Sequence, residues 1–487
     1  MLAVIMTDIR SRNISKQMKQ NFIILLSLLL SLTTNAQDKI PKISGTAKFS
    51  VENGTIECDI ILSDYSQISN YLIRLNKGMN IVNIQSVEPN EFLLGYKREL
   101  SDSLQTYESV SYYFPADVKG QKFLPKKLRF RYVGKFPVIN DTISENYQKA
   151  DWRGNIAFMN GLLRMDGYQS AWFPTLYDID NDFQYELVKY DIELICEDCE
   201  QIYINGSKPI NAKRGHFVSE SPREPYIFIG KYDIQEAENI TLLNANFTKN
   251  QVAEFDKING KVVDFLSSYT NIPYLEKVHW VQAYLTANEK GYFAFASNPT
   301  FTLCGNPPSD LKATFDKQLE GGFLLTLAHE LSHYYFGTIK NCNTTLENLL
   351  DEGFAEFMSL KFAESIGMEQ KVKESLKSSL EYVEDEDFKF KPIGEISSLA
   401  DINDRETYGY DYQPLILFSI EKEIGKEKMK QWIRLLLKSD TPTSDKDFMK
   451  STLREVIGNE KDYSKVINKF FHGEHTVKNI SETLKLL

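Results

Sequence analysis

Residues 326–334 read Thr-Leu-Ala-His-Glu-Leu-Ser-His-Tyr, and the two histidines in this stretch, His329 and His333, stand four positions apart. At that spacing on a helix both imidazoles point to the same side. A zinc ion about 2.0–2.1 Å from one nitrogen of each ring fits such a pair. Glu330 lies between them and can reach a metal-bound water without ligating the metal. The pattern therefore predicts a helix that carries half of a catalytic zinc site.

A candidate for the rest of the site is found at residues 349–357, which read Leu-Leu-Asp-Glu-Gly-Phe-Ala-Glu-Phe. A catalytic zinc needs a third protein ligand and one open position. Glu352 follows His333 by 19 residues, so a second helix that returns across the first can supply it. Glu356 lies one turn further on and can accept the other N–H of a ligating imidazole. The alternative is an amphipathic helix with solvated acids, but the neighbouring H-E-x-x-H favours the ligand interpretation.

The sequence on either side of these motifs indicates three regions. Residues 43–246 consist of short alternating runs cut by Gly, Asn and Pro, which is typical of strands. A helical period follows at 251–269, then two strand-like runs at 277–286 and 291–303, and after Asp310 nearly the whole chain is helical. The prediction is a multidomain α+β protein. It has a β-rich N-terminal domain at 37–246, a catalytic domain at 247–390, and a small helical C-terminal region at 391–487 with helices at 426–438, 445–457 and 460–471.

Composition excludes several classes of protein. The chain has 487 residues, of which 42% are hydrophobic and 25% charged, as in ordinary folded proteins. Global disorder and a multi-span membrane protein are therefore excluded. The net charge of −11 argues against a nucleic-acid binder, which usually carries a basic surface.

The N-terminus carries an apolar run at residues 22–32 that is too short for a membrane span of ~20 residues. Two lysines precede it, and small residues follow up to Ala36. This is the layout of a secretory signal peptide over 1–36, cut before Gln37, with 1–17 as a candidate N-terminal extension. A buried core helix is the alternative. We expect a secreted or periplasmic protein with no integral membrane segment after signal removal.

The chain has five cysteines, and export permits disulfides. The odd number leaves at least one thiol free. Cys196 and Cys199 form a lone C-x-x-C, which predicts a local disulfide or two plain thiols rather than a zinc site. Cys304 and Cys342 flank the histidine motif and are a second candidate pair.

H-E-x-x-H followed after eighteen residues by Glu in a D-E-G-F-A string resembles the aminopeptidase N family of gluzincin zinc metallopeptidases. Residues 171–174, Ala-Trp-Phe-Pro, are similar to a W-F-P string in the N-terminal domain of that family. The resemblance implies a thermolysin-like catalytic domain. It implies one zinc ion per chain on His329, His333 and Glu352, with Glu330 as general base. Asp351 stands where the family usually has Asn.

The resemblance also implies a tyrosine that stabilises the oxyanion of the tetrahedral intermediate. The family places it in a Y-x-x-G-x-x-x-L string, and Tyr410 aligns with that string, with Gln413 in place of the Gly. Tyr408 and Tyr412 are close alternatives. A phenol near the metal would stabilise the developing negative charge. The alternative is that Tyr410 only packs at a helix start.

The strand upstream of the zinc motif departs from the family. Family aminopeptidases carry a G-x-M-E-N string whose Glu binds the substrate's free α-amine. The matching segment here contains Ala296, Ser297 and Asn298, with the hydroxyl of Ser297 in place of that carboxylate. A hydroxyl cannot pair with an ammonium as a carboxylate does, although the strand can still bind an extended peptide through its backbone.

Together these features predict a zinc-dependent peptidase that acts on a peptide or protein substrate through a Glu-activated metal-bound water. Exopeptidase and endopeptidase activity both remain open. One alternative is a catalytically silent binding or scaffold protein with the same fold. Another is a zinc hydrolase that does not cleave peptides, which would have a closed apolar tunnel at the metal instead of an open groove.

Overall fold

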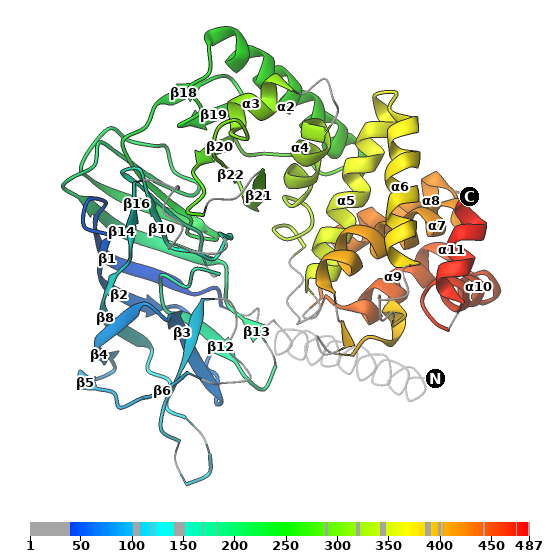
Figure 1. The fold of residues 1–487 in the computed structure, drawn as a ribbon. Coiled ribbons are helices and arrows are strands. Elements are labelled where there is room, and N and C mark those ends of the chain that lie inside the picture. The colour runs from blue at the N-terminus through cyan, green and yellow to red at the C-terminus, as the bar shows by residue number, and fades with distance from the viewer. Residues whose placement is uncertain are drawn as a thin grey trace, which may run out of the picture.

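The structure is a computed structural model, and it describes residues 39–485 apart from 101–107, 117, 121, 141–150, 168, 182, 288–290, 318–321, 341–346, 385–390, 398–400, 403, 442–443, 474. The predicted signal peptide and Cys342 lie outside the described residues. Within them, strands dominate the first half of the chain and helices the second, as Figure 1 shows. The predicted α+β organisation is therefore confirmed. None of the helices in the described part has the length and apolar character needed to cross a membrane.

The largest sheet of the N-terminal region has seven strands. Apolar and polar side chains alternate along its strands, which explains why one face of the sheet packs on the core. In the strand at 127–135, Leu128, Phe130 and Tyr132 are buried, and the residues between them face outward. The strand order is β16 (Arg214–Arg223), β14 (Val188–Cys196), β1 (Lys42–Ser50), β2 (Thr55–Ser63), β8 (Lys127–Lys135), β4 (Met79–Glu88), β5 (Phe92–Leu93).

Two five-stranded sheets complete this region and share one hydrophobic core with the first. Trp172 and Phe173 of the W-F-P string lie fully buried in that core, and the Trp172 indole N–H donates to the carbonyl oxygen of Pro225. One sheet has the order β15 (Gln201–Ile204), β17 (Ile227–Gly230), β11 (Leu162–Met165), β10 (Ala157–Met159), β9 (Val138–Ile139). The other has the order β13 (Phe183–Gln184), β12 (Thr175–Asp178), β3 (Tyr71–Asn76), β7 (Ser109–Tyr113), β6 (Lys97–Glu99).

A fourth sheet lies between the β-rich half and the helical half of the molecule (Figure 1). Its order is β18 (Ile234–Glu236), β19 (Ile240–Leu243), β20 (Val278–Ala283), β22 (Thr300–Gly305), β21 (Tyr292–Ser297). The run predicted at 291–303 is a hairpin, because Asn298 and Pro299 turn the chain between β21 and β22. β18 and β19 also belong to this sheet, because β19 pairs in parallel with β20. Both strands precede the domain boundary that the sequence predicts between residues 246 and 247.

The helices pack on this sheet and on one another around a single core. They are α2 (Lys249–Thr270), α3 (Leu311–Asp316), α4 (Gly322–Ser332), α5 (Glu347–Ser365), α6 (Glu369–Val383), η2 (Ile393–Glu395), η4 (Thr407–Tyr412), α7 (Gln413–Ile424), α8 (Lys426–Lys438), α9 (Lys446–Ile457), α10 (Glu460–Phe470), α11 (Thr476–Leu484). Helix α2 begins with a capping box, in which Thr248 and Gln251 satisfy each other's backbone N–H groups. The core runs without a break from α2 and α4 to the C-terminal helices.

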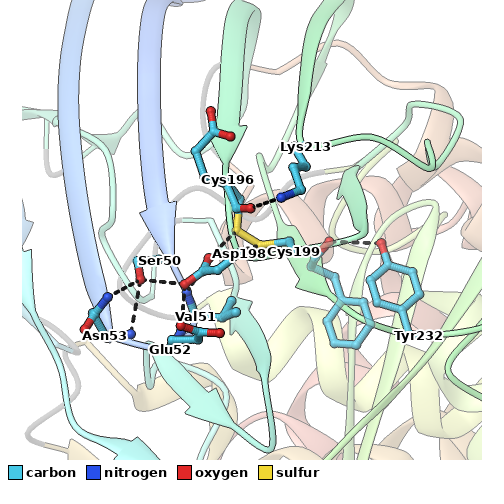
Figure 2. The surroundings of a disulfide bond; sticks show 11 residues. Ser50, Val51, Glu52, Asn53, Cys196, Asp198, Cys199, Lys213 and Tyr232 are labelled. Atoms are coloured by element: carbon cyan, nitrogen blue, oxygen red, sulfur yellow. Dashed lines mark hydrogen bonds between the residues drawn. A yellow bond between two sulfur atoms is a disulfide. The ribbon is translucent and has the colours of Figure 1, made fainter.

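The predicted C-x-x-C is a disulfide between Cys196 and Cys199 at the end of β14, shown in Figure 2. Asp198, between the two cysteines, accepts hydrogen bonds from the Ser50 hydroxyl at 2.6 Å and from the backbone N–H groups of Val51 and Glu52. The disulfide thus holds the residue that fixes the turn between β1 and β2. Cys304 is a free, buried thiol.

His279 of β20 is a buried residue that should make stability depend on pH. Its ring lies 5.1 Å from that of Tyr203 on β15, and its Nδ1 has no partner among the described residues. Burial, with the charges of Lys277 and Arg223, lowers the pKa of His279 from 6.5 to about 4. The unfolded chain therefore binds a proton near pH 6.5 that the folded protein does not bind until about pH 4.

We expect this histidine's contribution to be fully present above pH 6.5 and to be lost as the pH falls towards 4. The loss should amount to about 1.4 kcal/mol per pH unit and about 3 kcal/mol in total. Urea denaturation of wild type and His279→Phe, which keeps a ring beside Tyr203 without a titratable nitrogen, measures it. Parallel stability curves for the two proteins over this range would contradict the assignment.

Candidate metallopeptidase site

The site is a pocket between the fourth sheet, helices α4 and α5, and the N-terminal region. Helix α4 provides His329 and Glu330, and His333 follows directly after its last residue, in a turn closed by the bond from the His333 N–H to the Glu330 carbonyl. Helix α5 packs against α4 and carries Glu352 and Glu356. The residues that line the pocket come from both halves of the chain and include Arg153, Glu224, Ser297, His329, Glu330, His333, Glu352, Tyr410.

The three predicted metal ligands converge. One ligand atom each from His329, His333 and Glu352 lies within 4.8 Å of the other two. The Glu352 carboxylate is 3.1 Å from the Nε2 of His329 and 3.5 Å from the Nε2 of His333. Both Nδ1 atoms point away, to Glu356 at 3.0 Å and to the Phe336 carbonyl at 3.2 Å. Each imidazole is therefore oriented by one nitrogen and offers the other to the same point, which is how zinc-ligating histidines are held.

The histidines and the carboxylates of the site stabilise one another's charged forms. Burial disfavours charge on His329, but hydrogen bonds with Glu352 and Glu356 outweigh it and raise the pKa of His329 well above its usual value. Burial would raise the pKa of the Glu352 carboxyl, yet the two histidines hold it well below the usual range. Glu352 is thus an ionised carboxylate at the convergence point. Two imidazoles and one carboxylate are a donor set that suits zinc.

Glu330 differs from the other acids of the site. Its side chain is buried, it lines the pocket, and its Oε2 has no hydrogen-bond partner among the described residues. Burial outweighs the attraction of His329 and His333 and raises the pKa of Glu330. A buried carboxylate oxygen without a partner is costly, so a role in binding a proton or a water explains its retention.

Tyr410 is the one of the three candidate tyrosines that reaches the pocket. It lies in η4, a π-helical turn, a geometry often found at functional sites. Its ring stacks on that of His329 with centroids 5.6 Å apart, and its hydroxyl bonds to Glu352. Tyr408 instead donates to the Lys391 carbonyl, and Tyr412 is fully buried in the helical core. Partial burial and the nearby carboxylates raise the pKa of Tyr410, so its phenol remains a proton donor.

The predicted substrate strand forms one wall of the same pocket. Ala296, Ser297 and Asn298 line it, and β21 is the edge strand of its sheet. The sequence did not indicate that Arg153 reaches this wall from the N-terminal region. Its Nη2 lies 3.4 Å from the Ser297 hydroxyl and 2.5 Å from Glu224. No local motif marks Arg153, because only the tertiary fold brings it there.

Comparison with known proteins agrees with this geometry. Residues 320–473 match the model of the Peptidase family M1 domain. The fold resembles that of yeast LTA4 hydrolase, with a TM-score of 0.61 and 13% identity over 90% of this chain and 68% of that one. It also resembles an M1 zinc metallopeptidase mutant from Deinococcus radiodurans bound to a Tyr-Ser-Ala substrate, with a TM-score of 0.59 and 14% identity over 90% and 94% of the two chains. No curated protein sequence matches.

Residues 320–473 are therefore similar to the peptidase domain of family M1, and the fold of the chain is similar to the folds of these solved structures.

Proposed function

We propose that this protein is a zinc-dependent peptidase that hydrolyses peptide bonds at the pocket between α4, α5 and β21. The observation that carries the proposal is the convergence of His329, His333 and Glu352 beside a carboxylate oxygen of Glu330 for which the described part of the chain provides no hydrogen-bond partner. A binding protein without turnover would need the ligands, but it has no physical need for a buried base next to them.

The residues fit one zinc ion per chain. Zinc bound by His329, His333 and Glu352 would supply Lewis acidity and lower the pKa of a water in the open fourth position towards ~7. Glu356, at 3.0 Å from the Nδ1 of His329, fixes the orientation of that ring.

Two side chains would act in hydrolysis, one by transferring a proton and the other by stabilising the negative charge that develops on the substrate. Glu330, with a free oxygen and a raised pKa, takes a proton from the attacking water and passes it to the leaving amine. Tyr410, protonated and facing the same space, donates a hydrogen bond to the oxygen that becomes negatively charged. The substrate backbone would extend β21 as an added strand, which is a common mode of peptide recognition.

Replacing Tyr410 by phenylalanine should remove this hydrogen bond and the one to Glu352, and should keep the ring stacked on His329. Loss of one oxyanion donor typically lowers kcat by about 10²–10³-fold, and KM and zinc content should change little. Steady-state kinetics and metal analysis check this. Tyr408→Phe is the matched control: its hydroxyl bonds to the Lys391 backbone outside the pocket, so kcat should remain near the wild-type value. Similar losses in both variants would exclude Tyr410 as the oxyanion donor.

The activity itself is tested with protein that begins at Gln37, the predicted mature N-terminus. A peptide library with free and with acetylated N-termini is incubated with zinc-loaded protein, with protein treated with a chelator, and with chelated protein to which zinc is restored. Cleavage that the chelator abolishes and that added zinc restores supports the proposal. Zinc binding near one per chain without any cleavage would overturn it in favour of a scaffold or of a hydrolase for another substrate class.

A further inference from the structure

A cluster of three charged residues from the N-terminal region forms the pocket wall beside β21. The Arg153 Nε lies 2.9 Å from an Asp166 oxygen, and its Nη2 lies 2.5 Å from a Glu224 oxygen. Asp166 is fully buried and Glu224 nearly so, while the Arg153 side chain is 20% exposed and lines the pocket. The guanidinium is therefore the member of this cluster that is most open to a ligand.

Both acids of the cluster already have partners. The second oxygen of Glu224 accepts the Gly167 backbone N–H at 3.0 Å, and that of Asp166 accepts the Ser170 N–H at 2.6 Å. An ammonium group that paired with Glu224 would have to displace Arg153 from a charge-assisted bond. Glu276, another acid that lines the pocket, is paired in the same way, with Arg223 at 2.6 Å.

Arg153 of this wall and Ser297 of β21 both have N–H or O–H groups that can donate hydrogen bonds. The Ser297 oxygen lies 3.4 Å from the Arg153 Nη2 and accepts from it, which leaves the hydroxyl proton to donate elsewhere. The guanidinium also lies over the Phe295 ring of β21, 5.2 Å from its centroid. Arg153 pairs with both acids of the cluster, so neither carboxylate is left unpaired to attract a cation. Such a wall suits a neutral acceptor better than a cation.

We infer that Arg153 and Ser297 bind the carbonyl oxygen of the residue or acyl group that precedes the cleaved residue, so that the substrates are internal or N-blocked peptides and not peptides with a free α-amine at that position. This inference rests on the proposed peptidase function and names its substrate class. A free α-ammonium there has only protons to offer to these donors, and it would lie next to a guanidinium of like charge.

The test uses one peptide sequence in three forms, with a free, an acetylated and a succinylated N-terminus on the residue before the scissile bond. Zinc-loaded wild type should cleave the acetylated form with a kcat/KM at least about tenfold above that of the free form. The succinyl form separates a carboxylate acceptor from a carbonyl acceptor. Since the Arg153 guanidinium already pairs with two carboxylates, the succinyl form should be cleaved no faster than the acetyl form. A clear preference for the succinyl form would mean that the wall binds a carboxylate instead of a carbonyl, and would overturn the inference as stated.

Two variants identify the residues. Ser297→Ala should lower kcat/KM for the acetylated peptide several-fold through KM, and so reduce the preference for the acetylated over the free form. Arg153→Lys keeps the positive charge but loses the planar array of N–H donors of the guanidinium. It should also reduce the preference for the acetylated form. Thermal melting and zinc content confirm that each variant is folded and loaded.

The result that overturns the inference is a wild type that prefers the free amine. Loss of that preference in Glu186→Gln, which changes another acid of the pocket, would then identify the amine-binding residue. Failure of the proposed function looks different, because none of the three peptides would be cleaved by zinc-loaded protein.

Discussion

Glu330→Gln is expected to lower kcat for peptide cleavage by about 10³-fold or more, within the range found for removal of a general base. Glutamine has nearly the same shape as glutamate but cannot accept a proton, and the Glu330 Oε2 has no partner among the described residues that the change would disturb. His329 and His333, the proposed metal ligands, lie on either side of it and are not altered. Zinc content should therefore remain near one per chain, and KM should change little.

Glu330→Asp serves as the control, because it keeps a carboxylate but withdraws it by one methylene. Its activity should lie between those of wild type and Glu330→Gln. Single-turnover kinetics with metal analysis on the same samples separate loss of chemistry from loss of zinc. If Glu330→Gln retained more than about a tenth of wild-type kcat, a smaller effect than general-base loss produces, another group would have to be the base.

Glu352→Ala is expected to abolish stable zinc binding, and with it all cleavage. In the folded protein the Glu352 carboxylate is the group that both imidazoles face, at 3.1 and 3.5 Å. Without it two imidazoles remain, one ligand fewer than catalytic zinc sites use. We expect zinc affinity to fall by more than the about 10–100-fold that is typical of residues that only support a ligand. Competition with a chromogenic chelator measures the dissociation constant.

Glu356→Gln is the matched control for this variant, one turn along the same helix. It removes the negative charge that faces the His329 Nδ1 at 3.0 Å and leaves all three ligands in place. Its loss of affinity should stay within about 10–100-fold. Equal losses in the two variants would indicate that Glu352 supports the site without ligating the metal.

The local part of the site could be predicted from the sequence because helical spacing fixes it. His329, Glu330 and His333 belong to one turn and its continuation, and Glu352 and Glu356 belong to one face of α5. The helices predicted near 426, 445 and 460 are confirmed as α8, α9 and α10. Their boundaries agree within a residue, because Asp445 and Asn459 cap α9 and α10.

The rest of the site depends on tertiary structure. Arg153, Asp166 and Glu224 reach the pocket through strand pairings that no short motif reveals. The sequence predicts one continuous strand at 291–303, whereas the structure has a hairpin there, because the turn at Asn298 and Pro299 is only two residues long and leaves little sequence signal. The choice among Tyr408, Tyr410 and Tyr412 depended on which face of the π-helical turn meets the pocket, and sequence spacing does not determine that face.

One hydrophobic core joins α2 and α4 to the last helices of the chain. Helix α5 also packs on η4 and α7, so the elements beneath the pocket rest on residues that are synthesised last. A nascent chain that still lacks these helices has the H-E-x-x-H motif but not the packing that closes the pocket around it. For the proposed peptidase, activity would then arise late, when the C-terminal helices have docked, and an incomplete chain would not cut the proteins around it.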